Sequence, residues 1–400
     1  MFYNNIKRNV MAVICLVTLV MSVGCGNNTT DIQKGDVADV VGQTGVLTHS
    51  GDNIVIDAEP DISGSEYGVY SFLNISFDDS HIFDILFHDK DSATKETFSW
   101  EENGKTVYSH SYKTVHLQDD TRGENVQAEF GESLLVGGEP SGIMYTTPLS
   151  HLVLSFFRPA DMSYTAISGN DFTTDSLSFS SPDDAIHEVT NVLETIGLKV
   201  SDSPEIFAID APTANVVMER HRNMNIYGFN TALYPDSYSI SDECYFIVFN
   251  ATHNEVPIYN NGFNFTTVPD LYIGHPEIHV IYSQRGIEYL NVTLGIDEYE
   301  LIETVTEIVN AESAMNIVVS RYNELITSSN IVFKSVTLMY VFKPAGNGSQ
   351  NLIMTPAWVF DGVISSPSET FDGRGGVVVE MSVAGREVII IDALTGVEII

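Results

Sequence analysis

Two segments of the chain carry the residues that start α-helices, and each leads into a series of short apolar runs. Ser181, Pro182, Asp183 and Asp184 supply a capping hydroxyl, a proline in the first turn and negative charge at a helix start. Apolar residues then recur at helical spacing up to Gly197, which can end the helix. A helix with one apolar stripe must cover it, so the runs that follow predict a sheet beneath the helix.

Asn310 begins a second such helix, whose apolar residues stay in register through Leu325. The runs after it, IVFKSVTLMYVF, NLIMTPAWVF, GGVVVEMSV and REVIIIDA, are strand-like and are separated by turn sequences. After the first helix, strands are expected near residues 205–210, 244–250 and 278–283, with another helix from Thr213 to about His221. We therefore expect an α+β fold with antiparallel sheets, in which residues 181–300 and 301–400 form two helix-plus-sheet units.

Residues 51–180 show a different pattern, in which β-branched and aromatic runs alternate with turn clusters such as ENGK and GGEPSG. One short helix is predicted from Asp79 to Phe87, with Ser80 as its cap and Ile82 and Leu86 facing inward. This part of the chain is therefore expected to form a separate, β-rich N-terminal domain.

The first 24 residues have the layout of a secretory signal peptide. Lys7 and Arg8 precede an apolar stretch of about 12 residues, which is shorter than the roughly 20 residues needed to span a bilayer. The next residues, Ser22 to Cys25, resemble the lipobox of bacterial lipoproteins, although the first position is usually Leu. The resemblance implies diacylglyceryl transfer to the Cys25 thiol and cleavage before it. A plain secretory signal with an incidental cysteine is the alternative.

Residues 25–50 are polar and rich in Gly, Thr and Asp, as expected for a flexible tether. With the bilayer holding acylated Cys25, we expect the protein at the extracytoplasmic face of the bacterial cell membrane. Removal of the signal also removes Cys15, which leaves Cys244 as the other cysteine. No internal disulfide and no cysteine-based zinc site are then available, and Cys244 fits a buried thiol in a strand.

The charge of the chain limits its partners. There are 18 Lys+Arg and 54 Asp+Glu residues, which gives a formal net charge of −36. Binding to nucleic acid phosphates or to anionic lipid through a basic patch requires clustered Lys and Arg, so neither is expected. The 44% of hydrophobic residues is sufficient for a packed core.

Two stretches resemble known families. Residues 310–322 (NAESAMNIVVSRY) are similar to the opening helix of PepSY-type units, and residues 386–400 (REVIIIDALTGVEII) are similar to the strand, turn and strand that close them. LMYVF and TPAWVFDG, which lie between them, resemble the C-terminal strands of the YycH/YycI group. The whole chain also looks like lipoproteins of clostridial type. The resemblance implies a membrane-tethered accessory protein that modulates a sensor kinase, and it supplies no catalytic residues. The turn at Asp392 and Gly396 also has a purely structural explanation.

The motif search gives no catalytic set, no metal site and no cofactor. Ser92 and Lys95 match S-x-x-K of penicillin-recognising enzymes, but the companion elements are missing. His275 and His279 are four residues apart, but Pro276 argues against a helix there. The Asp-rich loops do not fit a calcium-binding loop. Structural roles are expected for these residues.

The leading interpretation is a lipid-anchored, non-catalytic binding or regulatory module for another envelope protein. A solute- or glycan-binding lipoprotein is the alternative, although such proteins usually contain two lobes of alternating strands and helices. A hydrolase that uses carboxylates alone remains open, because paired acids can do acid–base chemistry without a sequence motif.

Overall fold

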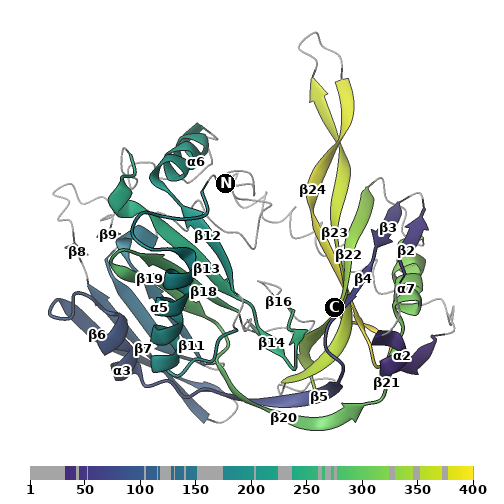
Figure 1. Cartoon of the computed structure of the whole chain (residues 1–400), viewed down its shortest axis with the longest axis horizontal. Coiled ribbons are helices and arrows are strands. Elements are labelled where there is room, and N and C mark those ends of the chain that lie inside the picture. The colour runs from purple at the N-terminus through teal and green to yellow at the C-terminus, as the bar shows by residue number, and fades with distance from the viewer. Residues whose placement is uncertain are drawn as a thin grey trace, which may run out of the picture.

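Two large β-sheets stand side by side in the computed structural model, and a ribbon of two long strands joins them at one end (Figure 1). The fold is α+β with mainly antiparallel sheets, which confirms the class expected from the sequence. The structure describes residues 32–41, 45–51, 53–102, 105–114, 116–117, 128–129, 131–138, 141–150, 174–201, 204–223, 237–259, 264–265, 272–273, 277–323, 329–345, 352–371 and 377–399.

The eight-stranded sheet is antiparallel throughout, with the strand order β12-β13-β18-β19-β11-β10-β7-β6. Its strands are β6 (Ala93–Glu102), β7 (Lys105–Thr114), β10 (Ser133–Gly137), β11 (Gly142–Thr146), β12 (Glu205–Ile209), β13 (Cys244–Phe249), β18 (Ile278–Ser283) and β19 (Gly286–Val292). The three strands expected between residues 205 and 283 are confirmed.

This sheet contains two copies of one unit, a helix followed by four strands that pair in chain order. The first repeat comprises α3 (Asp79–Leu86), β6, β7, β10 and β11, and the second comprises α5 (Pro182–Thr195), β12, β13, β18 and β19. Their last strands, β11 and β19, pair antiparallel in the middle of the sheet, with Tyr145 opposite Leu290. Both helices pack on the same face and share one apolar core. The two repeats are therefore joined edge to edge.

Local sequence explains where α5 begins and ends. The Ser181 hydroxyl accepts a hydrogen bond from the Asp184 N–H at 3.2 Å, and Pro182 occupies the first helical position. Gly197, with φ of +88°, ends the helix in the left-handed conformation that favours glycine. Both ends of this helix agree with the sequence prediction.

The cap of α3 is different from the one expected. The Asp78 carboxylate, and not Ser80, caps the helix, because it accepts hydrogen bonds from the N–H groups of Ser80 and His81, both at 3.1 Å. Ser80 already lies within the first turn, where its own N–H needs an acceptor. Ile82 and Leu86 are buried, as predicted.

The nine-stranded sheet combines strands from both ends of the described chain. Its order is β2-β3-β22-β23-β24-β25, with β4 beside β22 and β5 beside β20 and β23. The bounds are β2 (Leu47–Ser50), β3 (Ile54–Ala58), β4 (Pro60–Ile62), β5 (Tyr67–Asn74), β20 (Ile296–Val305), β22 (Asn330–Pro344), β23 (Leu352–Phe371), β24 (Val377–Asp392) and β25 (Glu398–Ile399). Strands β3 and β4 run parallel to β22, and the other pairs are antiparallel.

Helix α7 (Ala311–Asn323) covers this second sheet and begins a third repeat, which continues through β22, β23, β24 and β25. The Asn310 side chain caps it by accepting a hydrogen bond from the Ser313 N–H at 2.8 Å. Trp358 is fully buried in the core shared with α7, and its indole N–H donates to the Val309 carbonyl at 2.7 Å. Trp358 therefore packs beneath α7.

The two sheets are nested in the chain. Residues 75–295 supply the whole eight-stranded sheet, and the nine-stranded sheet is built from strands on either side of them, where β1 and β21 form a separate pair. The predicted serial boundaries do not separate these sheets. Strands from residues 51–180 divide between the two sheets, because β3 to β5 join the C-terminal strands while β6, β7, β10 and β11 continue the sheet of residues 205–292. Strand β2 of the nine-stranded sheet comes from residues 25–50, which were expected as a flexible tether. Strands β5 and β20 connect the sheets as one antiparallel ribbon.

The end of the third repeat matches its sequence signals with one difference. Residues 377–392 form one strand where two were expected, because the pairing with β23 continues through a register shift near Gly385. In the turn that follows, the Asp392 carboxylate accepts hydrogen bonds from the N–H groups of Leu394 and Thr395, and Gly396 has φ of +71°. The structural explanation of this turn is confirmed.

Helix α6 (Ala211–Asn223) lies on the opposite face of the eight-stranded sheet from α3 and α5. It confirms the helix expected near residues 213–221. None of the helices in the described ranges is long and apolar enough to cross a bilayer. The remaining elements are β1 (Lys34–Asp36), α2 (Val37–Val41), β8 (His116–Leu117), β9 (Ala128–Glu129), η3 (Ile240–Asp242), β14 (Thr252–His253), β15 (Val256–Pro257), β16 (Asn264–Phe265), β17 (Tyr272–Ile273) and β21 (Glu307–Val309).

Candidate functional site

An aromatic cluster joins the two sheets. Strands β14 and β15 form a small hairpin after β13, and its turn places Asn254 and Glu255 at positive φ. The hairpin carries the His253 ring to Tyr70 and Tyr299 of the connecting ribbon, with centroid distances of 4.4 and 4.3 Å. Such edge and tilted contacts are favourable aromatic geometries. The hairpin therefore fixes the position of one sheet against the other.

The imidazole of His253 lies in a setting that favours its neutral form. Burial among the tyrosine rings lowers the pKa of His253. One ring nitrogen, Nε2, lies 3.3 Å from the Asn254 amide nitrogen, and the same amide donates to the Tyr70 hydroxyl at 3.3 Å. Protonation of His253 would therefore weaken the contact between the sheets.

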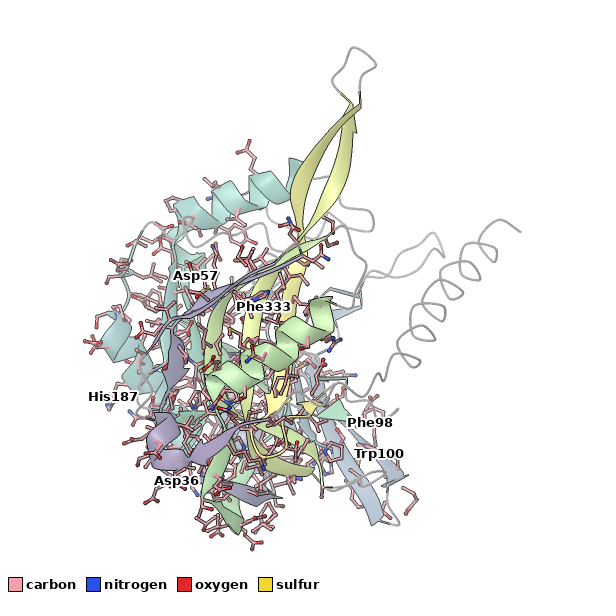
Figure 2. All side chains as sticks on the ribbon, turned by 90° about the vertical axis from the view of Figure 1, so that its right-hand side faces the viewer. Asp36, Asp57, Phe98, Trp100, His187 and Phe333 are labelled. Atoms are coloured by element: carbon pink, nitrogen blue, oxygen red, sulfur yellow. The ribbon has the colours of Figure 1, made fainter. Side chains whose placement is uncertain are left out.

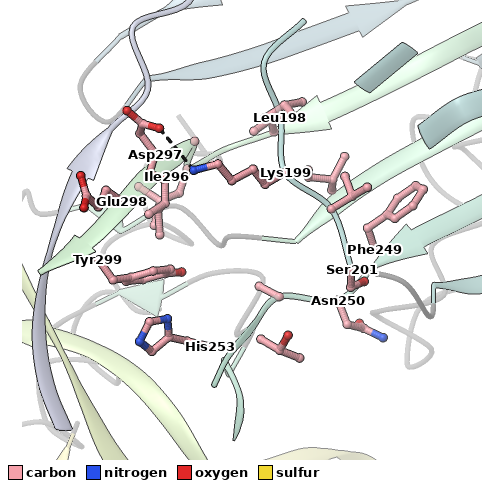
Figure 3. A pocket seen from close by; sticks show the side chains of 17 residues that line it. Leu198, Lys199, Ser201, Phe249, Asn250, His253, Ile296, Asp297, Glu298 and Tyr299 are labelled. Carbon is pink, nitrogen blue, oxygen red and sulfur yellow. Dashed lines mark hydrogen bonds and ion pairs between the residues drawn. The ribbon is translucent and has the colours of Figure 1, made fainter. Parts of the chain in front are cut away.

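A pocket of about 400 Å³ adjoins this cluster, between the end of β19, the start of β20 and the segment that precedes β12 (Figure 3). His253 and Tyr299 form its aromatic wall. Lys199 lies at its mouth, where its ammonium group donates to the Asp297 carbonyl at 2.9 Å and lies 3.6 Å from the Asp297 carboxylate. The Ser201 hydroxyl is buried and has no hydrogen-bond partner among the described residues. The pocket is large enough for a small solute.

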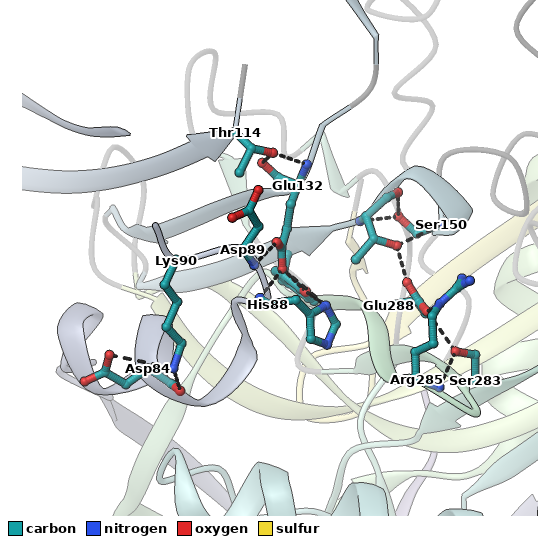
Figure 4. Close-up of polar contacts among 12 residues, drawn as sticks. Asp84, His88, Asp89, Lys90, Thr114, Glu132, Ser150, Ser283, Arg285 and Glu288 are labelled. Carbon is teal, nitrogen blue, oxygen red and sulfur yellow. Dashed lines mark hydrogen bonds and ion pairs between the residues drawn. The ribbon is translucent and has the colours of Figure 1, made fainter. Parts of the chain in front are cut away.

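A buried carboxylate in the first repeat ties α3 to the sheet (Figure 4). Glu132 accepts hydrogen bonds from the N–H groups of His88 and Asp89, at 2.6 and 2.9 Å, just beyond the end of α3. The Tyr145 hydroxyl donates to the same carboxylate at 2.5 Å, and burial raises the pKa of that phenol. Donors from the protein occupy this carboxylate, so its role is structural.

The second repeat has a buried carboxylate of its own, Glu288 on β19 (Figure 4). It accepts from the Ser283 hydroxyl and the Arg285 guanidinium, both at 2.7 Å, and from the Thr147 hydroxyl. The neighbouring Cys244 thiol is fully buried, and burial raises its pKa, which disfavours the reactive thiolate. The expectation of a buried structural thiol at Cys244 is confirmed.

A third polar cluster joins α3 to β6 and β7. Asp79 accepts hydrogen bonds from the Lys95 ammonium, at 2.7 Å, and from the Tyr112 hydroxyl, and His110 lies 3.9 Å away. Burial alone would raise the pKa of Asp79, but these hydrogen bonds outweigh burial and lower it. Asp79 is therefore a carboxylate held ionised between a helix and the sheet.

The structure places Ser92, Lys95 and His279 among the residues that the sequence singled out. Lys95 of the S-x-x-K match binds Asp79, and Ser92 lies in the turn before β6. His279 lies on β18 with its Nε2 3.1 Å from the Glu277 carboxylate, whereas His275 and Cys25 lie outside the described residues. Within those residues, no group of three or more His, Cys, Asp or Glu side chains could hold a metal ion.

Comparison with known proteins supports the fold and no more than the fold. No protein-family model matches the chain, and no curated protein matches it. It is similar in structure to an uncharacterised protein from Eubacterium rectale, known from a crystal structure, with a TM-score of 0.53 and 15% sequence identity. The match covers 90% of this chain and 97% of that one. A similar fold therefore extends over most of both chains.

No pattern in the sequence predicts the pocket. His253 and Tyr299 are 46 positions apart by their numbers in the sequence, and neither belongs to a motif. Glu132 and Glu288 are two of 54 acids, and their buried contacts come from residues far away in the sequence, such as Tyr145 or His88 for Glu132 and Thr147 for Glu288. The one local signal is Asn254, which adopts positive φ together with Glu255, because Asn-containing turns favour hairpins.

Proposed function

We propose that this chain is a lipoprotein, held at the extracytoplasmic face of the membrane through acylated Cys25, that acts as a non-catalytic binding or regulatory module for another envelope protein. One observation carries the proposal, namely the helix followed by a four-stranded antiparallel meander, which occurs three times in the fold. This arrangement is consistent with the PepSY-like and YycH/YycI-like resemblance of the C-terminal sequence, and those families restrain or modulate envelope partners.

The described polar clusters support a non-catalytic role. Glu132 and Glu288 are each held by at least three donors from the protein, and burial raises the pKa of the Cys244 thiol. A general acid or nucleophile needs an atom that is free to meet substrate. These groups serve packing between helices and sheets instead.

The anchor and the partner are tested in two steps in the native host. Labelling with a palmitate analogue should mark the wild-type chain, and the matched Cys25→Ala variant should lose the label and be released from the membrane. Crosslinking of the tagged chain in intact cells, followed by mass spectrometry, should then enrich one sensor kinase or cell-wall hydrolase. Enrichment of a permease with its ATPase, or of nothing above background, would contradict the proposed function.

Solute binding is the second candidate, because the pocket between the sheets offers an aromatic wall and the buried Ser201 hydroxyl. A thermal-shift screen with sugars and short peptides tests it. A ligand that raises the melting temperature of the wild-type chain, but not of Tyr299→Ala, would favour this candidate. The matched control is Tyr108→Ala, which changes an exposed tyrosine that does not line the pocket.

A further inference from the structure

The two repeats differ on the face of the eight-stranded sheet that α3 and α5 do not cover. In the second repeat α6 packs there, and its Val217 and Met218 share an apolar core with Phe246, Ile281 and Tyr289 of the sheet. In the first repeat, no described helix occupies the corresponding surface. We call this surface of β6, β7, β10 and β11 the open face.

Strand register places large apolar side chains on the open face. Met144 pairs with Asn291 on one side and with Leu135 on the other, and Leu135 pairs with Ser111, so these residues share a face. The next row of pairs puts Tyr289 on that same face, under α6. Leu135 is 40% exposed and Met144 is 46% exposed.

The edge strand β6 adds an aromatic side chain to this surface. Phe98 pairs with Ser109, which pairs with Gly137, and it is 48% exposed (Figure 2). Ser109 is buried although it has a small side chain, and Gly137, with φ of +115°, has none. On the open face, the large side chains of Phe98, Leu135 and Met144 therefore project beyond the small residues between them. Phe98 lies in one row of strand pairs, and Leu135 and Met144 lie in the next row. Exposed apolar side chains gathered on one face of a fold mark candidate interaction sites.

We propose that the open face binds an amphipathic helix of a partner protein, whose apolar stripe covers Phe98, Leu135 and Met144 and whose polar face is basic. This inference rests on the proposed function and names the chemistry of the partner. The second repeat supplies the argument for a helix, because α6 already covers the equivalent surface of the same sheet with Val217 and Met218.

The charge of the chain supplies the argument for a basic partner. On the open face, Glu96 and Lys113 lie 4.0 Å apart and offset each other. The long-range electrostatic field at this surface is then set by the net charge of the whole chain, which is formally −36. Such a field attracts a cationic helix and disfavours a second copy of this chain or an acidic partner.

Tryptophan fluorescence gives a direct assay with the full chain. The protein has two tryptophans, and Trp358 is fully buried whereas Trp100 is 40% exposed on β6, two residues from Phe98. Acrylamide quenching therefore reports on Trp100. The probe is a synthetic Leu/Lys peptide of about 18 residues, five helical turns, with its leucines at helical spacing. Two control peptides are used. One has the same composition with Leu and Lys in strict alternation, and the other is a helical Leu/Glu peptide.

The helical Leu/Lys peptide should protect Trp100 from quenching and should bind about tenfold more tightly than the alternating or acidic peptides, since each 1.4 kcal/mol of contact energy is worth a factor of ten. Leu135→Asp and Met144→Asp should each weaken this binding about tenfold, because they place a charge in the apolar contact. Ile302→Asp, at an exposed apolar position on β20 outside the open face, should leave binding unchanged.

Several outcomes would overturn the inference. Tighter binding of the alternating peptide would assign strand addition at the edge of β6 instead. Self-association of the wild-type chain in sedimentation, abolished by Leu135→Asp, would assign a second copy. Equal binding by all variants, or no binding of any peptide, would leave no role for the open face. Capture of the same envelope protein by wild-type and Leu135→Asp chains would contradict this inference while leaving the proposed function intact.

Discussion

The two repeats of the eight-stranded sheet have the same helix on one face and different surroundings on the other. Helices α3 and α5 share one apolar core, so both repeats bury apolar residues on that face. On the reverse face, α6, which lies between β12 and β13, covers the second repeat, and the first repeat leaves Leu135 and Met144 exposed. The comparison teaches that one covered face is enough for this unit to fold, and that the second face is available for function.

The largest effect on stability is expected when a charge is placed on the reverse face of each repeat. Val217→Asp puts a carboxylate into the closed core between α6 and the sheet, where burial of an unpaired charge costs about 3–5 kcal/mol. Leu135→Asp puts the same group on the open face, where water can reach it, and should cost less than about 1 kcal/mol. Urea unfolding followed by circular dichroism measures both. Equal losses would show that the open face is covered in solution.

The buried carboxylates should differ in a smaller way. Glu132→Ala leaves two backbone N–H groups, of His88 and Asp89, without their acceptor, and we expect a loss of about 2–4 kcal/mol. Glu288→Ala removes the acceptor of two hydroxyls and of the half-exposed Arg285 side chain. These groups can turn to other partners or to water, so we expect a loss of stability of about 1–2 kcal/mol. Denaturant midpoints of the two variants, measured with Thr106→Ala as an exposed control, would contradict this ranking if Glu288→Ala were the more damaging.

Each helix is also fixed to its sheet by one hydrogen bond between a phenol and a carboxylate. Tyr112 donates to Asp79 in the first repeat, and Tyr282 donates to Glu188 in the second. Tyr112→Phe and Tyr282→Phe should each cost about 1–2 kcal/mol, because the bond goes to a charged acceptor. The control is Tyr108→Phe, which alters an exposed phenol. A loss in only one repeat would show that the two helices are held by different means.

The smallest expected effect is a dependence on acid pH that belongs to the first repeat. The folded-state pKa of Asp79 lies below its usual value, so this group stabilises the fold above the unfolded pKa of about 3.9 and loses that contribution as pH falls through the folded value. Lowering the pH from 4 to 3 should therefore shift the denaturant midpoint of Asp79→Asn less than it shifts the midpoint of the wild-type chain. An unchanged difference between the two pH values would contradict the assignment.

Local chemistry explains what the sequence predicts well. Ser181 and Asn310 cap helices because their side chains reach N–H groups two or three residues ahead, and such signals involve neighbours in the chain. The fold class and most strands follow from similar short-range patterns. The cap of α3 was misassigned because Asp78 and Ser80 are both good caps, and only the backbone geometry decides between them.

Long-range pairing explains what the sequence does not predict. β3 pairs with β22 across about 280 residues, and nothing in the local pattern of either strand specifies the other. The nested order of the sheets, the pocket beside His253 and the open face at Leu135 all depend on such pairings. Exposed apolar residues on a strand have the same alternation as buried ones, so the open face has no signature of its own in the sequence.

Site-specific photo-crosslinking in the native host tests the central claim most directly. A benzoyl-phenylalanine placed at position 135 or 144 samples the open face, and one placed at position 302 samples an exposed control surface on β20. The account predicts that positions 135 and 144 crosslink to one envelope protein, through a peptide that maps to a basic amphipathic helix, and that position 302 does not. Crosslinking of the same protein from position 302, or none from positions 135 and 144, would contradict it.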